Sequence, residues 1–318
     1  MSKKLKFCLI GSKTNQKTEE DNSITLLVKA AKKANVILNN IPKGKIILSI
    51  DNNSGFSVSG NDVDIQEQDL FIFRDISELI HKASNTKVRI FAELCTIASH
   101  IYYRLGKPVF DSFIISGSQT NTKVIQAYTL MQAGLPIIPT YAFFRKDQVL
   151  KNIDKLHFPL FLKPADGSKG RDTYLFRTRE DLLGFLQNYN LPIFYPNIFQ
   201  EFIDNDGDYR IVVLGDEVIA SIFKIRPKDS IVSNMSKGAA AIPVEIPQEL
   251  KEMAIKAAKT LKIEFAGVDI IQDRKSGKFY ILEVNLSPQI TLTSYYSGVN
   301  IADIVIQYLI KKCRESNS

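Results

Sequence analysis

The sequence predicts a mixed α/β (α+β) fold divided into compact lobes. Short β-rich apolar runs alternate along the chain with stretches of helical spacing. The 318 residues are 45% hydrophobic and 24% charged, which allows a sizeable core, and no internal repeat or low-complexity segment interrupts them. A chain of this length and composition is typical of a soluble globular protein with more than one domain.

The first lobe is expected over residues 1–114. Its longest helical stretch closes at Gly106, and Pro108 then prevents the helix from continuing and leads into another strand. The first domain boundary follows that strand. The β-rich runs lie at 5–11, 45–50 and 69–73, and helical spacing occurs at 23–34, after a serine cap, and at about 90–106.

Two further lobes are expected over residues 115–194 and 195–318. The first of them begins with a helix, continues through a proline-marked loop, and has strands on either side of a glycine-containing loop. The second combines several strands with two helices. Helices are predicted after Asn121, near 145–155, and at 178–188, 247–262 and 299–312; strands are predicted at 157–165, 197–203, 208–215, 217–225, 265–271 and 278–285.

The composition disfavours several classes of protein. The three cysteines form no CxxC and the three histidines lack metal-ligand spacing, so no disulfide framework, zinc site or histidine base is indicated. The N-terminus lacks a signal-peptide cleavage site, and no apolar run is long enough to span a bilayer. We therefore expect a cytoplasmic protein that has no membrane partner.

The net charge of +7 suits an anionic ligand such as a nucleotide. Because the lysines are scattered in pairs, solvated faces explain them better than a nucleic-acid patch does. Nucleic-acid binding is the weakest of the functions considered, and salt-sensitive binding to random DNA would test it.

A candidate metal site lies in the last predicted strand pair. Side chains two apart in a strand share a face, so Glu283 and Asn285 point the same way. The preceding strand carries Asp269, and the turn-rich linker with Gly277 favours an antiparallel hairpin. A hairpin symmetric about Ser276 sets Asp269 directly opposite Glu283, whereas a one-residue bulge would offset this register.

Two carboxylates that face each other across a ladder repel unless a cation neutralises them. Two acids and an amide oxygen are hard ligands suited to a magnesium ion that bridges phosphates, with Mn2+ as an alternative to Mg2+. An ordinary exposed hairpin with one acid in each strand is the competing interpretation of the same pattern.

A candidate phosphate-binding lid follows Lys163. In the sequence DGSKGRD, Gly167 and Gly170 would let backbone N–H groups approach an anion closely. The spacing is not that of a P-loop, and a simple hairpin turn is the competing interpretation.

Other segments could serve the same nucleotide. QEFI at 200–203 could pair with a purine through the edge of a strand, and Glu201 or Asp208 could bind ribose hydroxyls. Cations on successive strands could neutralise a transferring phosphate, because period two directs some of them to one surface. These cations are Arg210, Lys224 and Arg226, for which ordinary surface positions are the competing interpretation.

Seven segments follow one another in the order NTK (121–123), FLKPADGSKG (161–170), FQEFI (199–203), DYRIVVLGDEVIAS (208–221), SNMSKGAA (233–240), AGVDII (266–271) and LEVNLSP (282–288). They resemble the ATP-grasp superfamily, and within it the RimK-like branch of glutamate and amino-acid ligases. The resemblance covers about residues 115–310 and is most specific over 197–290. It implies an ATP-grasp fold, with two lobes that hold ATP between them and an N-terminal α/β pre-ATP-grasp lobe.

The resemblance also implies roles for individual residues. The ATP phosphates would be contacted by Lys123 and Lys163 and covered by a lid of Ser168, Lys169 and Gly170. Adenine would be held by Gln200, Glu201, Phe202 and Ile203, and ribose by Asp208. The γ-phosphate or acyl phosphate would be contacted by Arg210 and Lys224, with Asn234 as a polar wall of the reacting pocket. Magnesium would be bound by Asp269, Glu283 and Asn285.

The implied activity is an ATP-dependent ligase that forms an amide or peptide bond through an acyl phosphate. It would join a glutamate-like amino acid to a peptide, protein or small acceptor, and it would form homo-oligomers. Val232 stands where the family usually has a basic or polar residue, and Ala239 replaces the second glycine of a pair, so the substrate stays open. A macrocyclising peptide ligase and a nucleotide-binding regulatory protein without catalysis are the alternatives.

Overall fold

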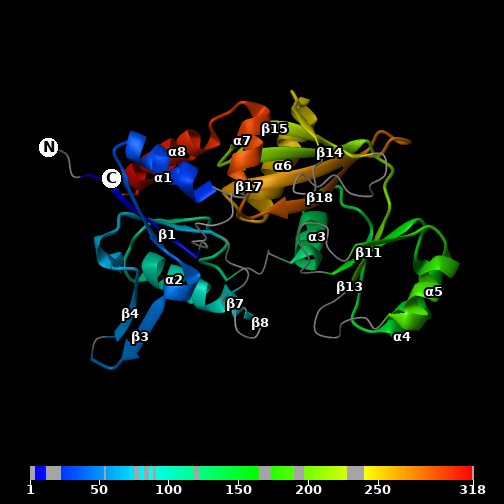
Figure 1. The fold of residues 1–318 in the computed structure, drawn as a ribbon, viewed down its shortest axis with the longest axis horizontal. Helices are drawn as coiled ribbons and strands as arrows, with labels where there is room; N and C mark the ends of the chain where they lie inside the picture. Colours follow the sequence, from blue (N-terminus) through cyan, green and yellow to red (C-terminus); the bar gives the residue numbers. More distant parts are fainter. Residues whose placement is uncertain are drawn as a thin grey trace.

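The computed structural model describes residues 4–11, 23–53, 55–74, 79–81, 86–88, 91–117, 122–164, 173–189, 197–227 and 240–316. Figure 1 shows an N-terminal lobe, a C-terminal sheet above it and a separate central lobe at one end of the molecule. No helix in these ranges is long and apolar enough to cross a membrane.

The N-terminal lobe is built on a parallel sheet of order β2-β1-β6-β9. Its strands β1 and β6 are buried almost throughout, as expected for a parallel sheet covered on both faces. The predicted strands at 5–11 and 69–73 and the two predicted helices are confirmed. The elements are β1 (Lys6–Ile10), α1 (Ser23–Lys33), β2 (Ile37–Ile41), β6 (Leu70–Phe73), α2 (Phe91–Tyr103) and β9 (Val109–Phe110).

The predicted strand at 45–50 does not join this sheet. It forms β3 (Ile47–Asp51), which pairs antiparallel with β4 (Gly55–Gly60), and β4 pairs in turn with β5 (Val63–Asp64). All five residues of β3 are exposed, and the β3–β4 hairpin projects from the lobe at the lower left of Figure 1. The short strands β7 (Leu79–His81) and β8 (Thr86–Val88) form a separate pair.

The central lobe is an antiparallel sheet of order β10-β13-β11-β12 with its own apolar core under two helices. Strand β13 lies inside this sheet, although the predicted boundary at 194/195 groups its residues with the C-terminal lobe. The three-part division stays a proposal, with β13 moved to the central part. The elements are β10 (Thr140–Phe143), α4 (Lys146–Asn152), β11 (Leu160–Pro164), β12 (Tyr174–Phe176), α5 (Arg179–Asn188) and β13 (Asn197–Glu201).

The C-terminal sheet is antiparallel, with order β16-β15-β14-β17-β18. Its strands are β14 (Gly207–Leu214), β15 (Glu217–Ile225), β16 (Ala241–Pro243), β17 (Phe265–Gln272) and β18 (Phe279–Asn285). The helices are α6 (Gln248–Thr260), α7 (Ile290–Ser297), which the sequence patterns did not predict, and α8 (Ile301–Glu315). Helix α3 (Lys123–Gln132) lies beside β18, between this sheet and the central lobe (Figure 1).

The two faces of the C-terminal sheet have different surroundings. On one face, Ile211 and Val213 belong to a core that includes the alanines of α6. On the other face, Val212 and Leu214 pack in a core with α8 and α1. Because alternate residues of β14 share a face, the latter face continues from Val212 to Arg210 and Asp208, where charged side chains replace the apolar ones.

Candidate active site

The predicted register of the metal hairpin is confirmed. Asp269 of β17 lies directly opposite Glu283 of β18, and Gly267 lies opposite Asn285. The reason differs from the one predicted, because the pairing shifts by one residue at a bulge between Asp269 and Ile270. The hairpin is therefore not symmetric about Ser276 near its turn, and the bulge restores the register at the acids.

A row of charged side chains runs across the four strands β15, β14, β17 and β18, the last two of which form this hairpin. Arg210 lies opposite Asp269, and Asp208 lies opposite Lys224. The Arg210 guanidinium donates twice to the Asp269 carboxylate, with Nε to Oδ1 at 2.5 Å and Nη2 to Oδ2 at 2.7 Å. Lys224 pairs with Asp208, and its Nζ is 3.4 Å from Asp269 Oδ2. The prediction that period two directs Arg210 and Lys224 to one surface is thus confirmed, whereas Arg226 follows the strand and pairs with Asp204.

These charges are buried, and their mutual attraction decides their ionisation. Burial alone would raise the pKa of Asp269, but the neighbouring Arg210 and Lys224 outweigh it and hold that pKa below its usual value. Burial likewise opposes the charge of Arg210, and Asp269 more than compensates and raises the arginine pKa. Asp269 and Arg210 therefore both carry their charge at neutral pH.

Asn285 joins the two acids. Its Nδ2 is 3.2 Å from Glu283 Oε1 and 3.4 Å from Asp269 Oδ2, and it also donates to the carbonyl of Gly267 at 3.2 Å. Gly267 has no room for a side chain, since an added Cβ would lie 3.0 Å from Pro288 Cβ. The glycine thus lets the segment after Asn285 pack closely against β17.

The three side chains fit a magnesium ion bound together with phosphates. Magnesium is usually held by one or two carboxylates while substrate phosphates and water complete its shell, and this donor set supplies two carboxylates and one amide. Rotating the Asn285 amide about its terminal torsion would turn its oxygen toward the acids. Among the described residues, no three histidine, cysteine, aspartate or glutamate side chains form a cluster that could hold a metal unaided.

Two lysines from outside the C-terminal sheet act on Glu283. Lys123, the first residue of α3, has its Nζ 3.8 Å from Glu283 Oε2. Lys163 of β11 is the second lysine: burial and the charge of Lys123 lower its pKa to about 8, while the charge of Glu283 acts to raise it. Charged side chains of α3 and β11 thus act on Glu283 of β18, and their contact with ATP phosphates stays a prediction.

The segment predicted to hold adenine has no free strand edge at Gln200, and its contact with adenine stays a prediction. Residues up to Gln200 are paired on both sides, with β10 and with β11, so β13 is not an edge strand. The correction follows from the sheet order, which a single strand does not reveal. After β13, Phe202 donates its N–H to the carbonyl of Pro159, and its ring packs edge-to-face against Phe161.

Other polar groups of this segment, from side chains and from the backbone, already have hydrogen-bond or ion-pair partners. Gln200 donates through Nε2 to Thr140 Oγ1 at 2.8 Å, and Glu201 pairs with His157 at 2.9 Å. The carbonyl of Ile203 accepts a hydrogen bond from Asn205 at 2.7 Å. Asp208 is buried beside Lys224, which is consistent with holding that lysine; its ribose contact stays a prediction.

Several predicted residues lie outside the described residues. They are Ser168, Lys169 and Gly170 of the lid, Asn234, and the two departures Val232 and Ala239.

Two further residues that contact the site were not predicted from the sequence. Gln126 of α3 bonds to the backbone of Val284, and Arg74, at the end of β6, donates to the carbonyl of Pro288 at 3.0 Å. No motif marks either position, because both act on backbone groups of a distant segment.

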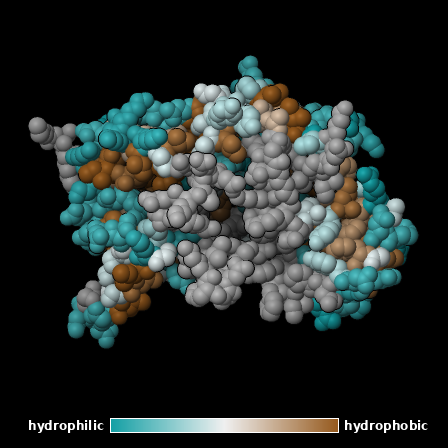
Figure 2. All heavy atoms as spheres, in the orientation of Figure 1, coloured by the Kyte–Doolittle hydropathy of each residue, from teal (hydrophilic) through white to brown (hydrophobic). Residues whose placement is uncertain are grey.

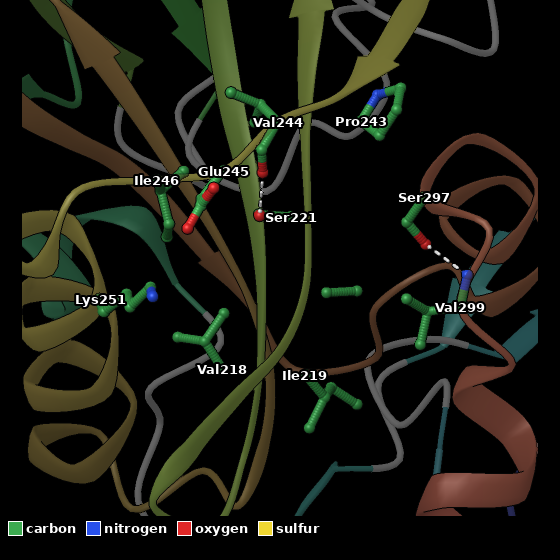
Figure 3. Close-up of a pocket in the computed structure, with 11 residues that line it drawn as sticks. Val218, Ile219, Ser221, Pro243, Val244, Glu245, Ile246, Lys251, Ser297 and Val299 are labelled. Atoms are coloured by element: carbon green, nitrogen blue, oxygen red, sulfur yellow. Dashed lines mark hydrogen bonds between the residues drawn. The ribbon is translucent and has the colours of Figure 1, made fainter.

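A pocket of about 420 Å³ lies apart from these charges (Figure 3). It is lined by β15, by the chain between β16 and α6, and by residues at the end of α7, and Ser221 Oγ donates to the carbonyl of Val244 at 2.6 Å within it. None of the predicted site residues lines this pocket, so it is not the nucleotide site.

Comparison with models of protein families shows which family the chain belongs to. The model of the RimK-like ATP-grasp domain matches residues 120–309, more than half of the chain. The chain belongs to the RimK-like ATP-grasp family. It is an ATP-grasp ligase by this membership, and the predicted resemblance and fold are confirmed.

Similar proteins of the RimK-like family include amino-acid ligases. The α-aminoadipate–LysW ligase LysX of Saccharolobus solfataricus is 27% identical over 265 residues, which cover 82% of this chain and 89% of that protein. The LysX of Sulfurisphaera tokodaii is 30% identical over 69% of this chain and 76% of its own length. A probable α-L-glutamate ligase of Mannheimia succiniciproducens is 30% identical over 55% of this chain and 58% of its own.

Solved structures share the fold of this ATP-grasp ligase at lower identity. The ligase PsnB, complexed with its precursor peptide PsnA2 and AMPPNP, superposes with a TM-score of 0.69 at 19% identity and covers 97% of this chain and 98% of that one. The D-alanine–D-alanine ligase of Bacillus anthracis, complexed with ATP, gives 0.64 at 17% identity, with 99% of each chain covered.

Proposed function

We propose that this ligase activates a carboxylate as an acyl phosphate and joins it to an amine, with a glutamate-like amino acid as one substrate and a peptide, protein or small acceptor as the other. The observation that carries the proposal is the convergence of Asp269, Glu283 and Asn285 with Lys123 and Lys163 from two other elements. The identities of 27–30% to amino-acid ligases support the choice of substrate class.

The reaction needs no nucleophile from the protein. The substrate carboxylate attacks the γ-phosphorus of ATP, the bond to ADP breaks, and the resulting acyl phosphate loses phosphate when the amine attacks. Catalysis then rests on positioning and on charge neutralisation, which Lys163 of β11 and Arg210 and Lys224 of the neighbouring strands β14 and β15 would supply. When bound by Asp269, Glu283 and Asn285, magnesium would supply charge stabilisation at the phosphates.

Arg210 and Asp269 constrain each other in this scheme. The bidentate bond holds the Asp269 carboxylate ionised and fixed in direction. Asp208, on the neighbouring strand, pairs with Lys224 and fixes the position of its ammonium group. The acids and cations are thus preorganised before ATP binds.

The direct test is a screen for ADP release with ATP and Mg2+ against amino acids and acidic peptides, followed by mass spectrometry of the products. We expect ADP release only when a carboxylate and an amine substrate are both present, and a product heavier by one amino-acid residue. Replacing Mg2+ with Mn2+ tests the metal preference. ATP turnover that ignores every carboxylate would contradict the proposal.

A macrocyclising peptide ligase is the second candidate. It is favoured by the match over nearly the whole chain to PsnB, which was solved with a precursor peptide, although at 19% identity this likeness concerns the fold alone. For each bond formed within a single peptide, such an enzyme would pass one carboxylate oxygen to phosphate by way of the acyl phosphate, so the peptide would become lighter by the mass of one water. A product that gains mass would exclude it.

A nucleotide-binding protein without catalysis is the third candidate. It would bind ATP and release no ADP with any amino acid or peptide pool. The complete set of two acids, an amide and two lysines argues against it.

We also propose that two copies associate through β3. This strand lies at the edge of its sheet, and Ile47 and Ile50 are 61% and 77% exposed. Figure 2 shows brown apolar spheres on part of the projecting hairpin, with teal hydrophilic spheres at its tip. Lys45 precedes the strand and Asp51 ends it, so antiparallel pairing of two copies about Leu48 would set each lysine near the aspartate of the second copy.

Sedimentation velocity over a range of protein concentrations tests this association. We expect a dimer that Asp51→Lys weakens and that the double change Lys45→Asp with Asp51→Lys restores. A monomer at all concentrations, or a dimer indifferent to both changes, would exclude β3 as the interface.

A further inference from the structure

The outer edge of β18 is closed by a helix instead of a strand. β18 is the last strand of its sheet, so no further strand pairs with the backbone N–H and carbonyl of Val284 on its outer side. Gln126 of α3 bonds to both: its Nε2 donates to the Val284 carbonyl at 2.8 Å, and the Val284 N–H donates to Gln126 Oε1 at 3.1 Å. The amide of Gln126 therefore takes the place of one peptide group of a missing neighbouring strand.

This contact is made at the centre of the metal hairpin. Val284 stands between Glu283 and Asn285, and because both of its polar backbone groups turn to Gln126, they point away from β17. The two peptide units that Gln126 holds are the ones that join Val284 to its neighbours, so the amide fixes the backbone of both predicted metal ligands. Gln126 is 7% exposed, and water does not compete freely for these bonds.

The hairpin needs such a support at this point. The bulge between Asp269 and Ile270 breaks the regular pairing immediately beside Glu283. Beyond the bulge, the same edge of β18 is tied again, where Ile281 donates its N–H to the carbonyl of Pro136 at 2.9 Å. The residues around α3 thus hold β18 on both sides of its irregularity.

Helix α3 also carries Lys123, three residues before Gln126. Residues three apart lie on the same side of a helix, and the Lys123 Nζ is 3.8 Å from Glu283 Oε2. One rigid turn of helix therefore sets the distance between a cation predicted to contact phosphate and the strand predicted to bind the metal.

We infer that Gln126 is a positioning residue for the magnesium site, which acts by holding the Val284 backbone so that Glu283 and Asn285 keep their place relative to Lys123. It touches the strand that bears the ligands and does not contact the reacting groups. The inference rests on the proposed function, because it takes Glu283 and Asn285 as ligands of the metal.

The test measures binding of ADP by calorimetry, in EDTA and in increasing Mg2+, with no turnover involved. The variant Gln126→Met keeps the length and volume of the side chain and removes both hydrogen bonds. We expect unchanged ADP affinity in EDTA and a roughly 10- to 100-fold rise in the Mg2+ concentration needed for half of the metal-dependent gain. The variant Gln126→Glu can still accept a hydrogen bond from the Val284 N–H. Its half-maximal Mg2+ concentration should therefore lie between those of the wild type and Gln126→Met.

Gln132→Met is the matched control, since it makes the same change at an exposed position of the same helix, and it should behave as wild type. Hydrogen exchange of the peptide that covers residues 281–286 should be faster in Gln126→Met, and a cooperative thermal transition would show that this variant is folded. Should Gln126→Met fail to fold, Gln126→Glu carries the same test.

Two results would overturn the inference: a folded Gln126→Met with wild-type Mg2+ dependence, or an equal loss of ADP affinity with and without Mg2+. Glu283→Gln in the same assay separates this from the parent proposal. If Glu283→Gln keeps the full Mg2+-dependent gain, the metal assignment itself is wrong.

Discussion

The β17–β18 hairpin and the β3–β4 hairpin differ in which side chains they bury. Asp269 in the first is 3% exposed, whereas Ile50 in the second is 77% exposed, the reverse of their hydropathies. A buried acid is kept where Arg210 and Lys224 can neutralise it, and an exposed aliphatic strand is kept where no core lies against it. Both departures from the usual burial pattern point to a use for the residue rather than to stability.

The largest expected difference between the hairpins is in catalysis. Asp269→Asn and Glu283→Gln each remove one charge from the predicted metal site, and we expect ADP release to fall by roughly 100-fold or more. Asp51→Asn makes the same change in β3 and should leave ADP release unchanged. Wild-type turnover in either variant of the first hairpin would remove the metal assignment.

Stability should separate the hairpins next. Arg210→Met leaves the buried Asp269 with only Lys224 nearby, so the free energy of unfolding should fall by about 3 kcal/mol. Ile50→Ser on the exposed strand should change it by no more than about 0.5 kcal/mol. Urea denaturation measures both free energies of unfolding. Comparable decreases in the two variants would mean that the Arg210–Asp269 ion pair does not stabilise the charged face.

The pH dependence tests the lysine beside the first hairpin. Burial and Lys123 lower the pKa of Lys163 to about 8, so in the free protein this lysine loses its charge as the pH rises through that value. Phosphate binding favours the charged form, and the KM for ATP should therefore rise up to roughly tenfold for each pH unit above 8. Lys163→Arg keeps its charge, so its KM should be flat over the same range; a flat wild-type profile would contradict the role.

The smallest expected effect is that of Ile47→Ser on the β3 hairpin. ATP turnover should match wild type, because β3 belongs to a separate sheet from the charged face. Only self-association, measured by sedimentation, should weaken. A loss of turnover without a change in association would connect β3 to the active site and break the contrast between the hairpins.

The sequence by itself predicted most helices and strands and the pairing of Asp269 with Glu283, because period and turn chemistry act over short distances. It also predicted the RimK-like family, through motifs that have a fixed order. The bulge that sets the register, and helix α7, gave no comparable local signal.

Only the tertiary structure decided which strand lies inside a sheet and which lies at its edge. Strand β13 proved to be interior, so its backbone is used by β10 and β11, and the edge of β18 proved to be closed by Gln126. These contacts join residues far apart in the chain through backbone groups, which every residue type possesses. No side-chain pattern in the sequence marks them, and the packing of separate elements alone brings them together.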